Sequence, residues 1–515
     1  MRPRHEAVKF TIAGSEGAWM TGDASARRRP IDLAAAAAGR LARASSSAVT
    51  SALGGRERTR VILLLASVLA LASADSATVG ASAIQLRHDL HINNTDVGLL
   101  VAVTSLVAAA ASVPFGVLAD RVRRTRLLGG AIVLWGAAMI WSATAPTFGR
   151  LLLARLFLGA VTAAAGPIVA SLVGDWFASS ERGRIYSYII SGELVGAAFG
   201  FAVTGGIATL SWRASFVILA LPAFALAWLV FSLPEPTRGG RNPLVSATAT
   251  PVAAAGSDDG DDDGEEHATD AQRLARERGI EPDPELILTN PHRLGLLAAA
   301  RYVLSIRTNV ALILASAFGY YFLSGVQTFG VQFVTQQYGI AQALSALVLL
   351  AVGAAGVIGV LVGGWLSDFL LHRGFLNARI LVSAIAATAA VILFVPAIFT
   401  RSPLTALPYI SLAAFALSAQ NPPIDAARLD IVHPLLWGRA EGIRTALRTL
   451  AQATAPLLFG AVSDYVFGGG RSGLQWTFAL MLLPLAASAY FLYKALRTYP
   501  RDVATASAST AASGS

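Results

Sequence analysis

Twelve long apolar segments, separated by short polar stretches, dominate the hydrophobic pattern of the chain. Each has about 20 residues, the length that an α-helix needs to cross a bilayer core of roughly 30 Å. The segments are rich in Ala and Leu and show no alternation with period two, so the pattern predicts helices rather than the strands of a membrane barrel. The twelve predicted spans are residues 61–84, 97–119, 127–145, 149–173, 186–208, 213–233, 308–333, 341–367, 379–399, 404–424, 441–466 and 474–494.

The composition is also that of a membrane protein. Hydrophobic residues make up 55% of the 515 residues and charged residues only 14%, and the mean hydropathy is +0.58. A soluble protein of this length needs many more charges to cover its surface. The chain has no cysteine, which excludes disulfides, thiol catalysis and cysteine-based metal sites. We therefore expect an all-α membrane protein without a cofactor or metal.

The net charge of +9 does not indicate nucleic-acid binding, because the arginines cluster in alternate loops between the spans. By the positive-inside rule these loops are cytoplasmic, and so are both termini. We expect a monomer in the plasma or inner membrane, with lipid around it and no nucleic acid as a partner. The clustered arginines are Arg121, Arg123, Arg124, Arg126, Arg182, Arg184, Arg428 and Arg439.

The spans fall into two groups of six, divided by a long polar stretch. That stretch carries an acidic tract over residues 258–266, which lacks the ligand spacing of a calcium loop and is expected to be a solvated linker. Its last part, residues 291–305, has the pattern of an amphipathic helix on the membrane surface. The predicted divisions are a disordered cytoplasmic tail (1–58), a six-helix bundle (59–233), a cytoplasmic linker (234–305), a second six-helix bundle (306–495) and a disordered tail (496–515).

A short motif occurs at the same place in both groups of spans. Gly116 and Asp120 stand four residues apart in GVLADRVRRTR, after span two, and Gly364 and Asp368 repeat this spacing in GGWLSDFLLHRG, after span eight. A motif placed alike in two halves indicates an internal duplication, which in so apolar a chain points to a transporter built from two related bundles.

The motif resembles the loop G-x-x-x-D-R-x-G-x-R-R of the major facilitator superfamily. Gly116, Asp120, Arg121 and Arg126 match it, whereas Arg123 replaces the second glycine. Span four carries Arg155 and Gly159, similar to the R-x-x-x-G signature of that family. The resemblance implies two pseudo-symmetric six-helix bundles that rock around a site at the middle of the membrane.

Within that superfamily the chain looks most like the spinster-like branch and its bacterial relatives. The resemblance is carried by Asp75 in span one, by SLVGDWF at the end of span four, by Asn421–Pro422–Pro423 after span ten and by GRAEGIRTALRTLAQATAPLLFGAVSD at span eleven. It implies a secondary active transporter of a lysolipid-like amphiphile or a small organic anion. A proton-linked multidrug exporter, a sugar or organic-acid permease, and a membrane sensor without transport are the alternatives. An enzyme is disfavoured because H-E-x-x-H, G-x-S-x-G and a cysteine nucleophile are absent.

Charges inside the bilayer are costly, so the few that the spans contain indicate function. We counted Asp75 and Glu193 as the deep carboxylates and Arg155 as the deep cation. Counted along their helices, Asp75 and Arg155 reach the same half of the bilayer, and we expect them to form an ion pair. Exchange of Arg155 for a proton on Asp75 would couple transport to protons. For Glu193, a structural role and proton carriage both remain open.

The repeated motif has a different expected role. Asp120 would accept hydrogen bonds from the beginning of span eleven, and Arg121 and Arg126 would pair with Asp175 at the end of span four. Such contacts would form a latch that closes the cytoplasmic side in one state and breaks in the other. The second copy, Gly364 and Asp368, is expected to keep the geometry with fewer basic residues.

Two further expectations concern the contacts between helices. Glycine stripes on spans five and eight would suit a seam between the two bundles, although packing within a bundle is the default interpretation. The cavity between the bundles would be lined mainly by apolar groups, which favours an amphiphile over a multiply charged solute. The candidate cavity residues are Tyr321, Gln327, Phe329, Ser418, Gln420 and Gln452.

Overall fold

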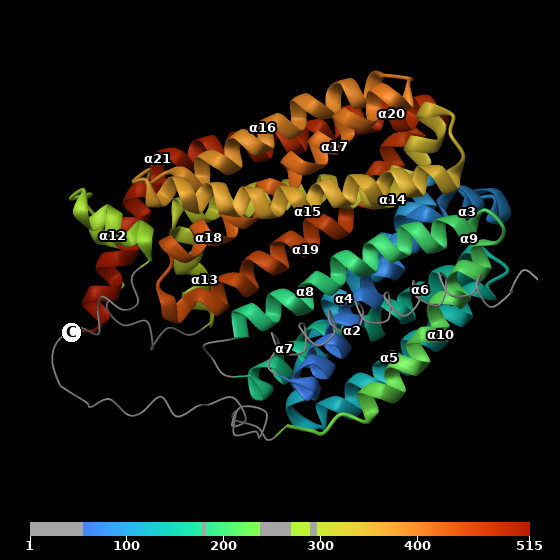
Figure 1. The fold of residues 1–515 in the computed structure, drawn as a ribbon, viewed down its shortest axis with the longest axis horizontal. Coiled ribbons are helices and arrows are strands. Elements are labelled where there is room, and N and C mark those ends of the chain that lie inside the picture. Colours follow the sequence, from blue (N-terminus) through green and yellow to red (C-terminus); the bar gives the residue numbers. More distant parts are fainter. Residues whose placement is uncertain (1–54, 178–181, 237–268, 289–295, 515) are drawn as a thin grey trace, which may run out of the picture. The chain divides into compact units, whose positions relative to one another are not determined.

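The structure is a computed structural model, and it describes residues 55–177, 182–236, 269–288 and 296–514. The chain divides into two compact units, Met1–Val61 and Ile62–Ser515. Of the first unit, only the beginning of one helix is described. The predicted N-terminal tail up to residue 54 and the acidic tract lie outside the described residues. Every regular element in the described part of the chain is a helix (Figure 1).

The first half of the molecule consists of the helices drawn in blue to green in Figure 1. Spans one, four and five are each built from more than one helix, and a π-helical turn, η1, interrupts span five. The elements are α2 (Arg56–Ala81), α3 (Ala83–Leu90), α4 (Asn94–Arg121), α5 (Arg124–Ala143), α6 (Phe148–Thr162), α7 (Ala165–Trp176), α8 (Arg182–Phe199), η1 (Gly200–Thr204), α9 (Gly205–Ala208) and α10 (Trp212–Phe231).

The second half consists of the helices drawn in yellow to red. Its elements are α14 (Arg307–Tyr338), α15 (Gln342–His372), α16 (Ala378–Phe399), α17 (Pro403–Ala419), α18 (Asn421–Ile431), η4 (Pro434–Leu436), α19 (Trp437–Ala461), η5 (Val462–Val466), α20 (Gly470–Leu480) and α21 (Leu482–Gly514). Between the halves lie α12 (Asp270–Glu277), η2 (Pro284–Leu286) and α13 (Leu296–Ser305).

Each predicted span corresponds to a helix or a run of helices. Among the described residues, ten helices are long and apolar enough to cross a membrane. The two predicted spans outside that set are span ten, whose helix α17 has 17 residues before Asn421 starts α18, and span eleven, whose helix α19 carries several charges. The twelve-helix membrane fold follows from the ten apolar helices together with these two.

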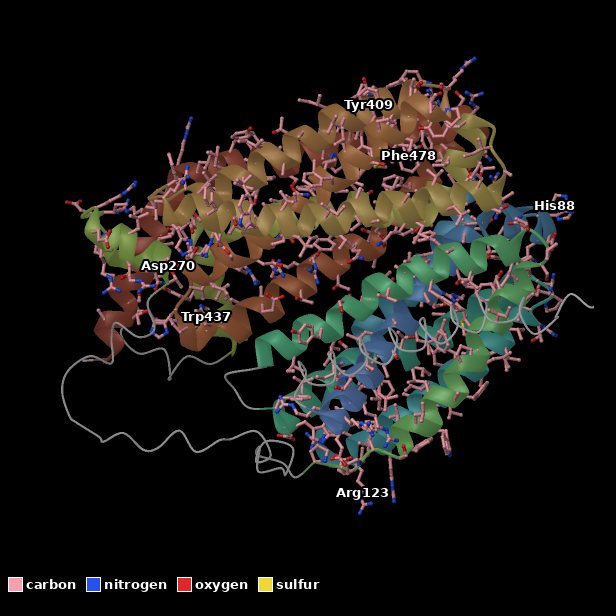
Figure 2. The ribbon with its side chains drawn as sticks, viewed as in Figure 1. His88, Arg123, Asp270, Tyr409, Trp437 and Phe478 are labelled. Carbon is pink, nitrogen blue, oxygen red and sulfur yellow. The ribbon has the colours of Figure 1, made fainter. Side chains whose placement is uncertain are left out.

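The ends of the helices define two ends of the molecule. Figure 2 places Arg123 at one end of the first half and His88 at the other. The side of the molecule that carries Arg123, at the junction of α4 and α5, is called the basic end. The side that carries His88 is called the opposite end. In the second half the basic end includes the junction of α15 and α16 and the beginning of α14, because consecutive spans alternate in direction.

The glycines of the two stripes pack within each half, whereas spans five and eight meet beside them, where Gly205 of α9 lies against Ala346 of α15. Added side chains at Gly192, Gly196 and Gly200 would overlap α2, at Ala66, Ala70 and Ala74. Those at Gly359 and Gly363 would overlap the backbone of α17. The default interpretation was correct here, since small residues allow two backbones to approach wherever helices cross closely.

The C-terminal segment does not form the disordered tail that we expected for residues 496–515. Helix α21 continues to Gly514, and Tyr499 and Val503 are fully buried beside Ala271 and Ala275 of α12. The linker is bound along this extension, since Thr505 accepts a hydrogen bond from the amide of Asp283 at 2.8 Å. A segment rich in Ala, Ser and Thr looks like a tail in sequence, but the linker covers it and gives it a core.

The contact between α15 and α17 gives a first prediction. Replacing Gly359 with valine places a branched side chain against the Phe415 carbonyl, and overpacking of this kind costs about 3 kcal/mol. We expect Gly359→Val to lower the midpoint of thermal unfolding in detergent.

The matched control is Gly353→Val on the same helix, because nothing lies within 4 Å of a side chain added there. Equal midpoints for the two variants would contradict the close approach of α15 and α17.

Candidate functional site

An ion pair between Asp75 and Arg155 lies inside the first half. Arg155 on α6 donates from Nη1 to Oδ1 of Asp75 at 2.7 Å and from Nη2 to Oδ2 at 3.0 Å, so the two groups meet in the bidentate geometry that suits a guanidinium and a carboxylate. Asp75 is 3% exposed and Arg155 is 2% exposed. The structure thus brings together the two groups that the sequence placed at the same depth.

Close helix packing holds this pair away from water. Helix α6 approaches α4 so closely that Gly159, one turn after Arg155, has no room for a side chain beside Thr104. On the other side, Gly200 begins the π-helical turn η1 and packs on Ala74 and Ala77, the neighbours of Asp75. A charge left alone in such a place is strongly destabilising. Separating Asp75 from Arg155 would therefore require another group to compensate each charge.

A second charged group lies where the two halves face each other. Arg448 on α19 places its Cζ 4.5 Å from the centre of the Tyr320 ring on α14, a cation–π contact. Glu193 on α8 is close enough to interact electrostatically with Arg448 and Tyr320. Much protein surrounds Glu193, but solvent still reaches it. Arg448 forms no ion pair with any described residue, and its Nε lacks a hydrogen-bond partner there. It is a cation with capacity to bind an anion.

Arg448 corrects our count of deep cations. It lies within predicted span eleven, yet the prediction counts Arg155 as the only deep cation. Helix α19 begins at Trp437 and carries Arg448 three turns into the helix. Counting residues from the start of the helix, rather than from the start of the apolar run, would have identified it.

At the basic end of the first half, Arg124 connects three segments. Its guanidinium binds Asp175 of α7, the Ser171 hydroxyl at 2.9 Å and Glu235 after α10 at 3.1 Å. Burial alone would raise the pKa of the Glu235 carboxyl. Hydrogen bonds from Thr125 and Arg124 outweigh burial, so the pKa of Glu235 lies below its ordinary value. Arg124 joins spans three, four and six by charge at this end.

This cluster corrects the predicted pairing of Asp175. We expected Arg121 and Arg126 to bind it, but both are exposed, and Arg124 is the residue that does. Arg124 occupies a variable position of the motif and Glu235 lies outside it, so the motif gave no signal for either. Gly116 and Asp120 lie on α4 near its end, but their side chains are outside the described residues.

The second half contains the same arrangement. Arg379 on α16 binds Asp430 of α18 at 2.5 Å and Asp368 of α15 at 3.2 Å. The separation between the paired residues is 51 in both halves, Arg124 to Asp175 and Arg379 to Asp430. The duplication inferred from Gly116 and Gly364 therefore extends to a buried arginine–aspartate pair. Gly364 and Asp368 lie on α15, one half-buried and the other 52% exposed at its side chain.

Hydrogen bonds between the halves lie at the opposite end, as far as the described residues show. Gln85 and Gln342 exchange two side-chain hydrogen bonds, at 2.5 and 2.8 Å. Asp464 in η5 accepts from the Asn94 side chain at 3.0 Å and from the Thr95 amide at 2.7 Å, at the beginning of α4. A carboxylate suits a helix N-terminus, where unpaired amides carry partial positive charge. These contacts hold the two halves together at one end.

The predicted cavity residues differ in how deeply they are buried and in which helices they contact. Phe329 is fully buried, and Tyr321 packs on Phe459 with ring centroids 6.1 Å apart. Gln420 is 1% exposed and lies near Ser488 within the second half. Ser418 packs beside Gly356 of α15. The half-buried members of this set are Tyr321, Gln327, Ser418 and Gln452.

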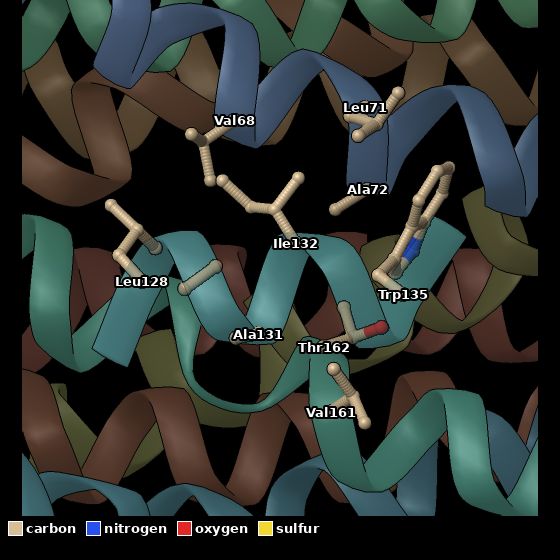
Figure 3. A pocket seen from close by; sticks show the side chains of 10 residues that line it. Val68, Leu71, Ala72, Leu128, Ala131, Ile132, Trp135, Val161 and Thr162 are labelled. Atoms are coloured by element: carbon tan, nitrogen blue, oxygen red, sulfur yellow. The ribbon is translucent and has the colours of Figure 1, made fainter. Parts of the chain in front are cut away.

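A small pocket in the first half contains no charged group. It holds about 30 Å³ between α2, α5 and the α6–α7 region, and Val68, Ile132 and Trp135 are among its lining residues (Figure 3). Its polar groups are the indole N–H of Trp135, which has no hydrogen-bond partner among the described residues, and the hydroxyl of Thr162, which donates to the Leu158 carbonyl at 2.8 Å. A space of this size fits a single water molecule and does not fit an organic solute.

Comparison with known proteins agrees with this architecture. The family model of the Major Facilitator Superfamily matches residues 63–411. The chain belongs to the Major Facilitator Superfamily. It is a multi-pass membrane transporter of small solutes and not an enzyme.

Relatives within the superfamily include both spinster proteins and sugar-acid transporters. The chain is 31% identical to human protein spinster homolog 3 over 163 residues, 30% of this chain and 31% of that protein. It is 22% identical to the D-galactonate transporter of Escherichia coli O6:H1 over 334 residues, 64% and 71% of the two chains. The match to the probable L-galactonate transporter of Escherichia coli K12, 25% identical, covers 33% of this chain and only 38% of that protein.

Solved structures agree on the fold. A bacterial homologue of the human lysosomal transporter spinster, in an inward-facing and occupied conformation, superimposes with a TM-score of 0.68 at 18% identity, covering 87% of this chain and 99% of that chain. Spinster proteins thus appear in both comparisons, in agreement with the spinster-like resemblance. The chain therefore shares the two-half helical fold of this superfamily.

The Arg124 cluster gives a second prediction. In Arg124→Gln, Asp175 and Glu235 keep their negative charges in half-buried positions without the cation. Breaking a buried pair in this way costs about 3 kcal/mol, so we expect a lower midpoint of thermal unfolding in detergent.

Arg126→Gln is the control, because Arg126 is exposed two residues away. A midpoint for Arg124→Gln equal to that of Arg126→Gln would show that the cluster does not stabilise the first half.

Proposed function

We propose that this facilitator is a proton-coupled secondary active transporter of a small organic anion, and that Asp75 is the proton carrier. The observation that carries the proposal is the buried Asp75–Arg155 pair in the first half. Protonation of Asp75 removes the charge that holds Arg155, and deprotonation restores it. A pair that is stable in one protonation state and unstable in the other links a proton to a conformation.

Arg448 is the group that we propose for substrate binding. It faces the region between the halves, interacts with Glu193 at electrostatic range without forming an ion pair among the described residues, and lies over Tyr320. A carboxylate of the substrate would supply the missing charge, and Tyr320 would offer an aromatic face to its carbon skeleton. The names of the galactonate and hexuronate transporters, which are relatives of this chain, describe solutes of this class. An anionic amphiphile, in keeping with the spinster relatives, is the second candidate.

Alternating access then requires that the contacts at the two ends alternate. In the described residues the halves are joined at the opposite end through Gln85, Gln342 and Asp464. By the positive-inside rule we assign the basic end to the cytoplasm, which makes this an inward-facing arrangement in the plasma or inner membrane. The latch of Gly116, Asp120 and Arg121 remains a proposal for the outward-facing state, in which the basic ends would meet.

The coupling role gives a third prediction. A gradient of one pH unit supports about ten-fold accumulation for each coupled proton. In proteoliposomes, Asp75→Asn should retain exchange of labelled for unlabelled organic anion and lose accumulation driven by the gradient, because a neutral side chain mimics the protonated state permanently.

Ser76→Ala is the control on the next residue, whose side chain is exposed. Gradient-driven accumulation by Asp75→Asn at the level of this control would contradict the proton-carrier role. Retained binding without any flux in the unaltered protein would instead identify a sensor.

The substrate role gives a fourth prediction. A hydrogen bond to a charged group contributes about 1.5–3 kcal/mol, so Arg448→Gln should weaken binding of a monocarboxylate sugar acid about 10- to 100-fold, measured by thermal shift or calorimetry. Arg448→Lys should recover part of that loss because it keeps the charge.

Arg401→Gln, which removes an exposed arginine at the opposite end, should bind as the unaltered protein does. Unchanged affinity in Arg448→Gln would overturn the assignment of the site.

A further inference from the structure

A second cavity lies far along the chain from the Asp75–Arg155 pair, at the basic end of the second half. It has a volume of about 480 Å³ and opens between α13, the first turns of α14 and the middle of α21. Its lining includes Arg307, the first residue of α14, and Lys494 on α21. None of its lining residues belongs to the proposed transport route.

The polar part of this cavity is positively charged. Arg307 and Lys494 are both exposed, neither forms an ion pair with a described residue, and no carboxylate lines the cavity. The nearest acid, Asp502, is 6% exposed and accepts the Thr308 amide at 2.9 Å, so it lies beneath the cavity. The hydroxyls of Ser305 and Thr498 add two neutral groups to the lining. Asp502 interacts electrostatically with Arg307 from beneath the cavity, but two cations against one acid leave a positive balance, which favours an anionic occupant.

The remaining lining is apolar and continues toward the membrane. Val310, Leu314 and Phe491 line the cavity beyond the two cations. The ring of Phe491 stacks on Phe318, with centroids 6.1 Å apart and planes at 11°. Charged groups at one side and aliphatic and aromatic groups at the other match a molecule with a charged head and an apolar chain.

Helix α13 indicates that the cavity lies at the membrane surface. Its inner face is buried, with Ala299 and Val303 at 0% exposed, whereas Leu297 is 88% and Leu304 43% exposed. A short helix with exposed leucines beside the start of a membrane span is typical of a segment lying in the interface between lipid and water. Lys494 stands at the end of the apolar run of the last span. A lysine at this depth usually extends its ammonium group to the lipid headgroups.

We propose that this cavity binds the headgroup of an anionic phospholipid from the leaflet at the basic end. Arg307 would contact the phosphate oxygens through its planar guanidinium, and Lys494 would act as a point charge beside it. One acyl chain would lie along Leu314 and Phe491. Basic pockets between membrane helices bind anionic headgroups for this reason. The bound lipid would fix the junction of α13 and α14, and thus join the linker to a span that carries Tyr320.

The test is native mass spectrometry of the full-length protein in detergent, with phosphatidylglycerol or phosphatidylcholine added. A basic residue near an anionic surface contributes about 1 kcal/mol. We therefore expect phosphatidylglycerol to bind about five-fold more weakly to Arg307→Gln or Lys494→Gln, and about 30-fold more weakly to the double variant. Phosphatidylcholine binding should not change.

Two further variants separate the cavity from general surface charge. Arg373→Gln removes an exposed arginine at the same end and should leave the affinity for phosphatidylglycerol unchanged. Leu314→Trp fills the apolar part of the cavity and should weaken binding with both cations intact, provided that the variant elutes as the unaltered protein does in size exclusion.

Three results would overturn the proposal. One is equal affinity of the unaltered protein for the two lipids, and another is equal loss of affinity in Arg373→Gln and in the cavity variants. The third is competition by soluble glycerol phosphate at the same concentration as the lipid, which would identify a site for a free phosphate compound instead of a membrane lipid.

Discussion

The buried ion pair between Asp75 and Arg155 is the constraint on which the rest of this transporter depends. Two charges at 3% and 2% exposure are tolerated only because each satisfies the other, and because α4, α6 and η1 close tightly around them. The same packing leaves neither charge an alternative partner among the described residues, which is why we propose the pair as the coupling element. Close glycine contacts in the first half thus serve both the stability of that half and the proposed coupling.

The two halves contain the same type of arginine–carboxylate cluster at their basic ends. In each, an arginine at the beginning of one span binds an aspartate 51 residues later, and a further acid, Glu235 or Asp368, joins the cluster. These clusters tie spans together inside a half. Hydrogen bonds between the halves, among the described residues, are instead made by neutral side chains and by Asp464 at a helix N-terminus. Strong bonds within halves and weaker bonds between them suit a molecule whose halves move as units.

The sequence predicted the repeated pattern better than the contacts between particular side chains. Asp75 and Arg155 could be paired in advance, because counting residues along two helices gives the depth of each. Asp175 was assigned to Arg121 and Arg126, because a motif gives spacing along the chain and not the direction in which each arginine points. Arg448 was missed although it lies inside predicted span eleven. The helix over residues 496–514 was missed because its core comes from the linker.

The sequence by itself determined the class of the protein, its twelve spans and its duplication. The length of an apolar run and a repeated motif can both be read along the chain without knowing any tertiary contact. Only the tertiary structure decided which arginine binds which acid, which glycines face which helix, and that an exposed pair of cations shares one cavity with apolar side chains. These features depend on the rotation of each helix about its axis and on contacts between distant segments. The rotation of a helix and its distant contacts are set jointly by many neighbouring side chains. A local stretch of sequence therefore does not specify these features.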